Sequence, residues 1–412
     1  MKKTIYPILF AATLLLAGAC SNDDTQGTEQ PIPTPYYPLE LSTAERQIAQ
    51  SNNEFAVRLF SEVAKSEQGE NLFISPLSAS YALAMLTNGA NGNTLDELKM
   101  ALGFADASLE EMNAFYRKLT DYLKNADGQS QFGIANSIWL NKGFEALPAF
   151  IATNHDVYSA EVRSLDFSDS DALRTINGWV SDKTYGHIPN LLDKISTDAM
   201  TYLINALYFK GVWKDKFEEI SSTFTNGDGR QTSVKSLTDT RNFAYTEDDD
   251  VQMAAINYGN GSFSLAIILP KENRTPQEVA SALTPTKWEE WTSRLNGAEL
   301  KMEFPTFSMN YGRALIDDLK ALGINDAFSP LAADFSKLSN SPIFVGLVQQ
   351  KSYIEVTKEG TVAAAATVIG GYTTSLPPTT GPINFIVDRP FLFAIKENST
   401  NTILFMGSVV NL

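Results

Sequence analysis

The side chains that most often perform catalysis are scarce in this chain of 412 residues. Its one cysteine is Cys20, and its histidines are His155 and His187. A hydrolytic triad would need one of these histidines, yet neither a G-x-S-x-G nucleophile turn nor a G-x-x-x-x-G-K-[ST] phosphate loop occurs. A single cysteine excludes an internal disulfide framework, and without cysteine in the body no Cys/His zinc site can form. The sequence therefore predicts no enzyme, no cofactor and no metal site.

A short alanine-rich stretch near the C-terminus is the other candidate for chemistry. It reads Glu359-Gly360-Thr361-Val362-Ala363-Ala364-Ala365-Ala366-Thr367. Small, uncharged side chains without proline can pass between the strands of a sheet while every backbone N–H remains free to donate. Gly360 tolerates the backbone angles that a hinge needs. Taken alone, however, the run favours a helix or a linker, because alanine is the best helix former.

The composition is that of a globular protein with an acidic balance. Hydrophobic residues make up 43% of the chain and charged residues 19%, which is enough apolar material for a large core. The formal net charge is −16. We expect no nucleic-acid partner, because phosphate binding needs a basic face.

The N-terminus is typical of an exported lipoprotein. Residues 1–19 predict a signal peptide, with Lys2 and Lys3 before an apolar stretch too short to span a membrane. This stretch ends in a segment, 16–20, that resembles a bacterial lipobox, so we expect Cys20 to carry a lipid. The alternative is an ordinary signal peptide followed by an incidental cysteine. Residues 20–41, rich in Thr, Gln and Pro, predict a flexible, lipid-anchored tether at the outer membrane or the bacterial cell surface.

From residue 42 to 412 the pattern predicts a single domain of mixed secondary structure. Helices are expected over 44–65 and 109–125, from Ser75-Pro76 towards Gly89, from Thr94, and over 171–184. Apolar runs at 132–140 and 200–209 indicate central strands, and further strands are expected at 253–258, 262–269, 299–308, 343–349, 391–396 and 402–410. The fold class is therefore α+β, built on large sheets.

Five segments in order resemble the serpin family. They are NLFISPLS at 71–78, TLDEL at 94–98, NALYFKGVW at 205–213, FIVDRPFLFAI at 385–395 and LFMG at 404–407. The resemblance implies the serpin fold over 42–412, with helices packed on large mixed β-sheets and an exposed reactive-centre loop. It also implies that residues 359–367 are the hinge of an irreversible, suicide-substrate inhibitor of serine proteases. In that mechanism the cleaved loop inserts into the central sheet while the protease is still attached as an acyl-enzyme.

The family's usual spacing from the hinge glycine places the reactive bond at Thr374–Ser375, with Tyr372–Thr373 as the alternative. No Lys or Arg occurs from Val362 through Val387, so we expect elastase-, subtilisin- or chymotrypsin-like targets and not trypsin-like ones. The resemblance implies a monomer that forms covalent 1:1 complexes with serine proteases, with papain-like cysteine proteases as a further class of target.

Two residues depart from the family's pattern. Lys358 stands where a glutamate is common, and Gln350 stands where many animal serpins have a histidine that helps to hold the sheet closed. Both departures concern the energy of sheet opening.

The alternative functions are a non-inhibitory serpin that binds or carries a ligand, and a surface-lipoprotein binding module.

Overall fold

The structure is a computed structural model, and it describes residues 34–67, 69–361 and 381–412. All of these lie within one unit, Ile32–Leu412. The helices of the described part are α1 Thr43–Ser66, α2 Pro76–Thr87, α3 Gly92–Leu102, α4 Leu109–Asn125, α5 Pro148–Tyr158, α6 Ala172–Lys183, α7 Pro276–Ser281, α8 Pro285–Ser293, α9 Ile316–Ala321 and the short 3-10 helix Asp326–Phe328. Among the described residues, none of these helices is both long and apolar enough to span a membrane.

The described strands form two sheets. In the nine-stranded sheet the order is β1-β15-β14-β8-β7-β6-β9-β13, with β5 paired to β6. Its strands are β1 Leu72–Ile74, β5 Glu218–Thr225, β6 Gln231–Glu247, β7 Val251–Asn257, β8 Phe263–Pro270, β9 Asn296–Pro305, β13 Ile383–Ile386, β14 Phe391–Glu397 and β15 Ile403–Val409. In the six-stranded sheet the order is β10-β11-β12-β4-β2-β3, with β2 Ser130–Asn141, β3 Glu161–Leu165, β4 Thr201–Val212, β10 Phe307–Ala314, β11 Leu347–Val356 and β12 Gly360–Thr361.

The helix starts follow local chemistry. Ser75 caps α2 by accepting a hydrogen bond from the backbone N–H of Ser78, and Pro76 occupies the first turn, as expected from the sequence. Every residue of α2 is buried, so this helix lies in the centre of the core. Ser42 and Ser108 begin α1 and α4 in the same way, each with a glutamate three residues on that completes a capping box.

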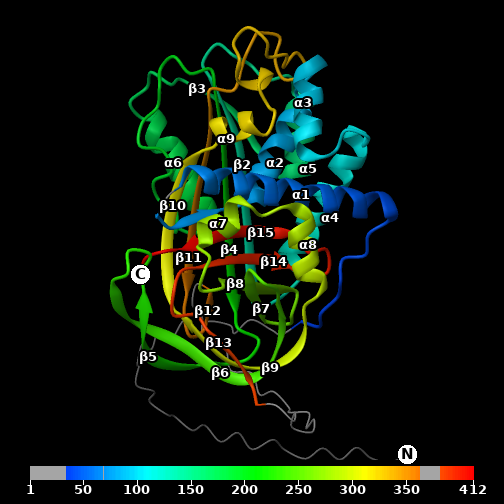
Figure 1. Cartoon of the computed structure of the whole chain (residues 1–412). Coiled ribbons are helices and arrows are strands. Elements are labelled where there is room, and N and C mark those ends of the chain that lie inside the picture. Colours follow the sequence, from blue (N-terminus) through cyan, green and yellow to red (C-terminus); the bar gives the residue numbers. More distant parts are fainter. Residues whose placement is uncertain (1–33, 68, 362–380) are drawn as a thin grey trace, which may run out of the picture. The chain divides into compact units, whose positions relative to one another are not determined.

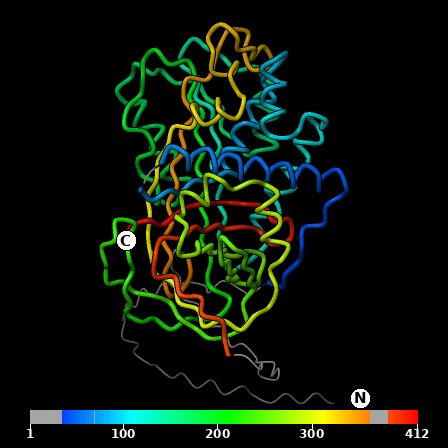
Figure 2. The backbone as a smooth tube through the Cα atoms, viewed as in Figure 1, coloured from blue at the N-terminus to red at the C-terminus, as the bar shows by residue number. Residues whose placement is uncertain are grey.

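The C-terminal strands (red) lie next to the N-terminal helices (blue) in Figure 2, and both α1 and α2 contact β15. Strand β15 pairs with β1 just ahead of α2, and all residues of β14 and β15 are buried. Both faces of these strands are therefore covered, which explains their continuous apolar sequence.

One face of the six-stranded sheet is covered by α6 and by residues 184–199, which follow it. Ile176 and Val180 of α6, and Ile188, Leu191 and Leu192 of the following segment, pack on alternate residues of β4. The opposite face of β4 contributes to the main core.

Most expected elements are confirmed, with three corrections. Helix α3 begins at Gly92, before Thr94, with Asn91 at the N-cap position but without a cap hydrogen bond from its side chain. The apolar run at 299–308 covers the end of β9 and the start of β10, which are separated at Thr306. The run at 343–349 is a strand only from Leu347, although Ile343 and Val345 are buried.

Residues 34–41, which we expected to belong to the tether, contact the rest of the unit. The Thr34 hydroxyl accepts a hydrogen bond from the backbone N–H of Gly128 (3.0 Å). The Tyr37 carbonyl accepts one from the Tyr122 hydroxyl (2.9 Å), and the Leu39 N–H donates to the Ser399 hydroxyl (2.9 Å). Contact with the unit thus starts at least as early as Thr34.

Candidate functional site

The predicted hinge begins directly after β11, and its first three residues are described. Glu359 lies in the turn that follows β11, while Gly360 and Thr361 form β12. The other predicted site residues lie outside the described residues: Val362, Ala363, Ala364, Ala365, Ala366 and Thr367 of the hinge, both candidate bonds (Thr374–Ser375 and Tyr372–Thr373), and Cys20.

Strand β12 lies between β11 and β4 (Figure 1). Thr361 stands opposite Val356 of β11 and Gly211 of β4, and Gly360 stands opposite Val212. The chain therefore enters the sheet at the point where the predicted hinge begins.

Gly360 is required at this position by a close approach of two backbones. Its φ is 149°, a value that side-chain-bearing residues rarely adopt. A Cβ atom here would collide with the carbonyl oxygen of Gly211 and lie 2.7 Å from the Cα atom of Val212. The backbone N–H of Thr357 donates to the Gly360 carbonyl (2.7 Å), which closes the turn between β11 and β12. The sequence suggested a swivel at Gly360, and the structure adds this steric reason for glycine.

Aromatic residues hold β12 in place. The hydroxyl groups of Tyr258 and Thr361 are hydrogen-bonded at 2.6 Å, and both residues are buried. Burial raises the pKa of Tyr258, so its phenol stays protonated. Trp213 stacks on Tyr258 with a centroid separation of 4.6 Å, and its indole N–H donates to the Thr357 carbonyl (2.9 Å). The backbone N–H of Trp213 donates to the Glu359 carbonyl (3.0 Å).

Between the start of β11 and β12, the described part of the six-stranded sheet has an opening, which lies above β12 in Figure 1. Strands β11 and β4 are parallel partners where Leu347–Gln350 face Tyr202–Asn205, and their ladder ends there. The same register would place Tyr353 opposite Tyr208, but residues 351–355 and 206–210 form no ladder pairs with each other. The two strands meet again only through β12. Between the ladder and β12, backbone groups of both strands therefore have no ladder partner across the opening among the described residues.

The side chains that flank this opening are held by an aromatic stack. The imidazole ring of His187 lies between the rings of Tyr208 and Tyr353, at centroid distances of 4.9 and 5.5 Å and interplanar angles of 16° and 20°. Tyr208 belongs to β4 and Tyr353 to β11. Burial raises the pKa of Tyr208 to about 12, so its ring is neutral.

Gln350 fastens the end of the β11–β4 ladder to α2. Its side-chain oxygen accepts from the backbone N–H of Ser75 (2.8 Å), and its amide nitrogen donates to the Ser75 carbonyl (2.7 Å). The side chain is buried, with 4% of the residue exposed. The neutral amide of Gln350 supplies one acceptor and one donor at this point. Both backbone groups of Ser75 are therefore hydrogen-bonded, although Gln350 stands where many animal serpins have a histidine.

Lys358, the second departure, lies at the other end of the opening. It is exposed and lines an open groove together with Glu219, Glu355 and Glu359. Its charge is therefore solvated and adds little to the energy of the sheet.

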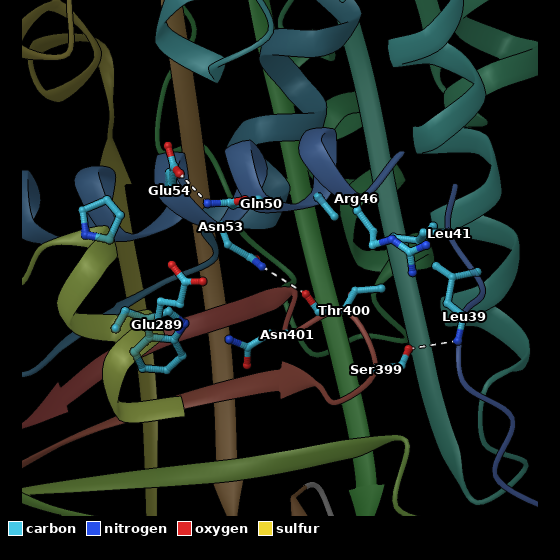
Figure 3. Close-up of a pocket in the computed structure, with 13 residues that line it drawn as sticks. Leu39, Leu41, Arg46, Gln50, Asn53, Glu54, Glu289, Ser399, Thr400 and Asn401 are labelled. Atoms are coloured by element: carbon cyan, nitrogen blue, oxygen red, sulfur yellow. Dashed lines mark hydrogen bonds between the residues drawn. The ribbon is translucent and has the colours of Figure 1, made fainter. Parts of the chain in front are cut away.

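A separate cavity lies between α1, α8 and the turn that joins β14 to β15 (Figure 3). Its volume is about 300 Å³, and its wall mixes Leu39 and Leu41 with charged Arg46, Glu54 and Glu289. Trp288 also lines it, and within the described part of the chain the buried indole N–H of this residue has no hydrogen-bond partner. The cavity offers apolar contact and charged groups to a small molecule.

Residues 50–412 match the family model described as "Serpin (serine protease inhibitor)". The human leukocyte elastase inhibitor is 34% identical over 378 residues, which cover 88% of this chain and 98% of that protein. Mouse glia-derived nexin is 33% identical over 86% of this chain and 90% of its own length. Among solved structures, the thermophilic serpin tengpin in its native state has a TM-score of 0.82 at 31% identity, covering 92% of this chain and 97% of its own. Human thyroxine-binding globulin in complex with thyroxine has a TM-score of 0.81 at 26% identity, with coverages of 90% and 99%.

Proposed function

Because the chain belongs to the serpin family, we propose that it inhibits serine proteases as an irreversible suicide substrate. The position of β12 is the observation that carries this proposal. Thr361 is paired with both β11 and β4, Gly360 is paired with β4, and the next residues of β11 and β4 (351–355 and 206–210) form no ladder pairs with each other. A segment that continued β12 towards the β11–β4 ladder would find backbone groups on β4 and β11 that no described residue pairs across the opening.

The register supports the role of the alanine run. Continuing the pairing of β12 to residue 364 brings Ala364 level with Tyr208 of β4 and with Tyr353 of β11. Residues 362–367 would occupy this position and the neighbouring positions between the two strands, and they carry neither charge nor proline. Such residues can enter a covered sheet without burying an unpaired polar side chain.

The covalent step uses the catalytic serine of the protease. Its hydroxyl oxygen attacks the carbonyl carbon of Thr374, the proton passes through the protease's base to the amide nitrogen of Ser375, and the C–N bond breaks. An ester then joins the protease to Thr374, and Ser375 carries a free amine. Because the amino-side half of the loop is released, it inserts between β4 and β11 as a continuation of β12 and moves the attached protease with it.

The free energy of insertion is sufficient to deform the protease. About a dozen new backbone hydrogen bonds at ~0.5–1.5 kcal/mol each amount to roughly ten kcal/mol, before any apolar burial is added. This is comparable to the whole stability of a domain. A deformed active site cannot complete hydrolysis of the ester, so the complex persists as a covalent 1:1 adduct of a monomeric inhibitor.

The loop's side chains select the target class. No Lys or Arg is present from residue 362 to 387, so the anionic pocket of a trypsin-like protease would be left with an unpaired charge. Thr374 suits elastase-like and subtilisin-like pockets, and Tyr372, at the alternative bond, suits chymotrypsin-like ones. The similarity to leukocyte elastase inhibitors supports the same choice. Papain-like cysteine proteases, which also form acyl-enzymes, are a further target class.

The proposal is tested by incubating residues 21–412 with elastase, subtilisin, chymotrypsin and trypsin in separate reactions. We expect a complex that survives denaturing electrophoresis with at least one of the first three, and cleavage after Thr374 by mass spectrometry. Trypsin is the matched negative control. Rapid trapping of trypsin would contradict the assignment of specificity, and cleavage by all four enzymes without a complex would contradict inhibition.

For location, we propose an exported lipoprotein attached to a bacterial membrane or cell surface by a lipid on Cys20. The lipobox-like segment 16–20 supports this, since the chain's one cysteine stands at the position that carries the lipid. Incorporation of labelled palmitate into the wild type but not into Cys20→Ala is the expected result. Equal labelling of both would refute it.

A second candidate function is that of a ligand carrier. The cavity beside Trp288 and the structural similarity to a thyroxine-binding protein favour it. This function predicts quenching of tryptophan fluorescence by a small apolar ligand, together with cleavage of the loop without a trapped protease.

A further inference from the structure

We propose that His187 is a positioning residue that ties β4 to β11 across the opening of the six-stranded sheet and thereby sets the rate of loop insertion. The inference rests on the proposed function, because it concerns the step in which these two strands separate. It assigns a role to a histidine that the inhibitory chemistry does not otherwise use.

The stack of His187 with Tyr208 and Tyr353 stands where the backbone ladder is missing. The β11–β4 ladder ends at Gln350, and its register would bring the two tyrosines face to face across the opening. His187 lies between their rings, nearly parallel to both. The side chain of a separate segment thus replaces a direct contact between the two strands, as stacked rings attract one another.

The segment that carries His187 is itself strained and fastened. Tyr185 has a φ of 53°, which is unusual for a bulky residue, and Gly186 follows with a φ of 81°. Such a conformation persists only where the surroundings hold it. The ring of Tyr185 lies against that of Tyr208, with centroids 5.5 Å apart, and the backbone N–H of Ile188 donates to the Thr184 hydroxyl (3.2 Å).

A second link crosses from the same segment to β11. The ammonium group of Lys351 donates to the carbonyl of Asn190 (2.5 Å). On the other side, Asn177 of α6 holds the segment by accepting from the backbone N–H groups of Leu191 and Leu192 (both 2.9 Å). Residues 187–190 therefore contact β4 and β11 at the same time while they remain anchored to α6.

The stack of His187 with Tyr208 and Tyr353 opposes insertion of a strand between β4 and β11. A strand that continues β12 must pass between Tyr208 and Tyr353, the level at which His187 is stacked. The two strands then move apart, and the imidazole ring must lose at least one of its partners. Removal of the ring should accordingly lower the barrier to sheet opening without altering the reactive bond.

The test measures sheet opening without a protease. The mature chain is incubated with a synthetic peptide of residues 361–374, and its uptake is followed by native gel electrophoresis. We expect His187→Ala to take up the peptide about tenfold faster than the wild type, which corresponds to ~1.4 kcal/mol in the barrier. His187→Phe keeps a stacking ring and should stay within about twofold of the wild type, since stacking is retained. His155→Ala is the matched control, because His155 lies exposed on α5 and faces Asp156.

A second pair of variants keeps the proposal testable if His187→Ala fails to fold. Tyr353→Leu should accelerate uptake to a similar extent, and the double variant should be no faster than either single one, because both remove the same link. Uptake by His187→Ala at the wild-type rate, in a chain that still traps protease, overturns the role of His187 alone. If no variant takes up the peptide and none traps protease, the sheet does not open, and this inference falls together with the proposed function.

Discussion

Replacing Gln350 with alanine should destabilise the native state, because this side chain joins the central sheet to the buried helix α2. Its amide makes one hydrogen bond to the N–H and one to the carbonyl of Ser75, at 2.8 and 2.7 Å. With 4% of Gln350 exposed, water does not reach these groups in the native state. The Ser75 carbonyl keeps a second partner in the N–H of Ala79 (3.2 Å), whereas its N–H depends on Gln350.

The magnitude follows from these contacts. Two neutral hydrogen bonds contribute ~0.5–1.5 kcal/mol each, and an N–H left buried without a partner costs about 1–3 kcal/mol. We expect Gln350→Ala to lower the free energy of unfolding by about 2–4 kcal/mol.

The assay is urea unfolding followed by tryptophan fluorescence, with Gln349→Ala as the matched control. Gln349 is only partly buried, and its amide donates to the carbonyl of Gln350 at 3.2 Å. The Gln350 variant should show a lower urea midpoint at an unchanged slope, and the control should stay close to the wild type. A loss of stability no greater than that of the control would refute the clamp.

Three further changes have defined outcomes. Gly360→Ala should displace β12, because the new Cβ would meet the carbonyl of Gly211, and limited proteolysis after Glu359 should become faster in the variant. Tyr258→Phe removes the hydroxyl that bonds Thr361 and should cost about 1 kcal/mol in urea unfolding, while an unchanged midpoint would show that this bond contributes nothing. Burial lowers the pKa of Lys396 to about 8, so the unfolded chain binds this proton more tightly and stability should rise by about 2 kcal/mol between pH 8 and 10. Lys396→Met should remove that rise, and a rise that persists in the variant would assign it to other groups.

Much of the fold could be predicted, because the strongest local patterns coincide with buried elements. The expected helix at 109–125 is α4, with its capping box at Ser108, and the apolar run at 200–209 is the centre of β4. The hairpin of β5 and β6 was missed. Its exposed positions alternate with partly buried ones, and its sequence is rich in Ser, Thr and charged residues, which hides the pattern of a strand.

The candidate site was predicted less completely. The hinge was located from its residues and from the family resemblance, but the partners that hold it come from distant parts of the chain. Ser75 meets Gln350, and Tyr258 meets Thr361, through the packing of whole sheets and helices. No local pattern marks such pairs. From the sequence His187 is a candidate only for a catalytic base, because no sequence pattern indicates that it stacks between two strands.

The most direct test of the account measures hydrogen exchange in the sheet before and after cleavage of the loop. Residues 206–210 of β4 and 351–355 of β11 face the opening and share no ladder pairs with each other. If the cleaved loop inserts between them, the amides that point into the opening gain partners, and their exchange should slow by a factor of about 100 or more. Exchange in these two segments that is unchanged or faster after cleavage would contradict insertion, and with it the proposed mechanism of inhibition.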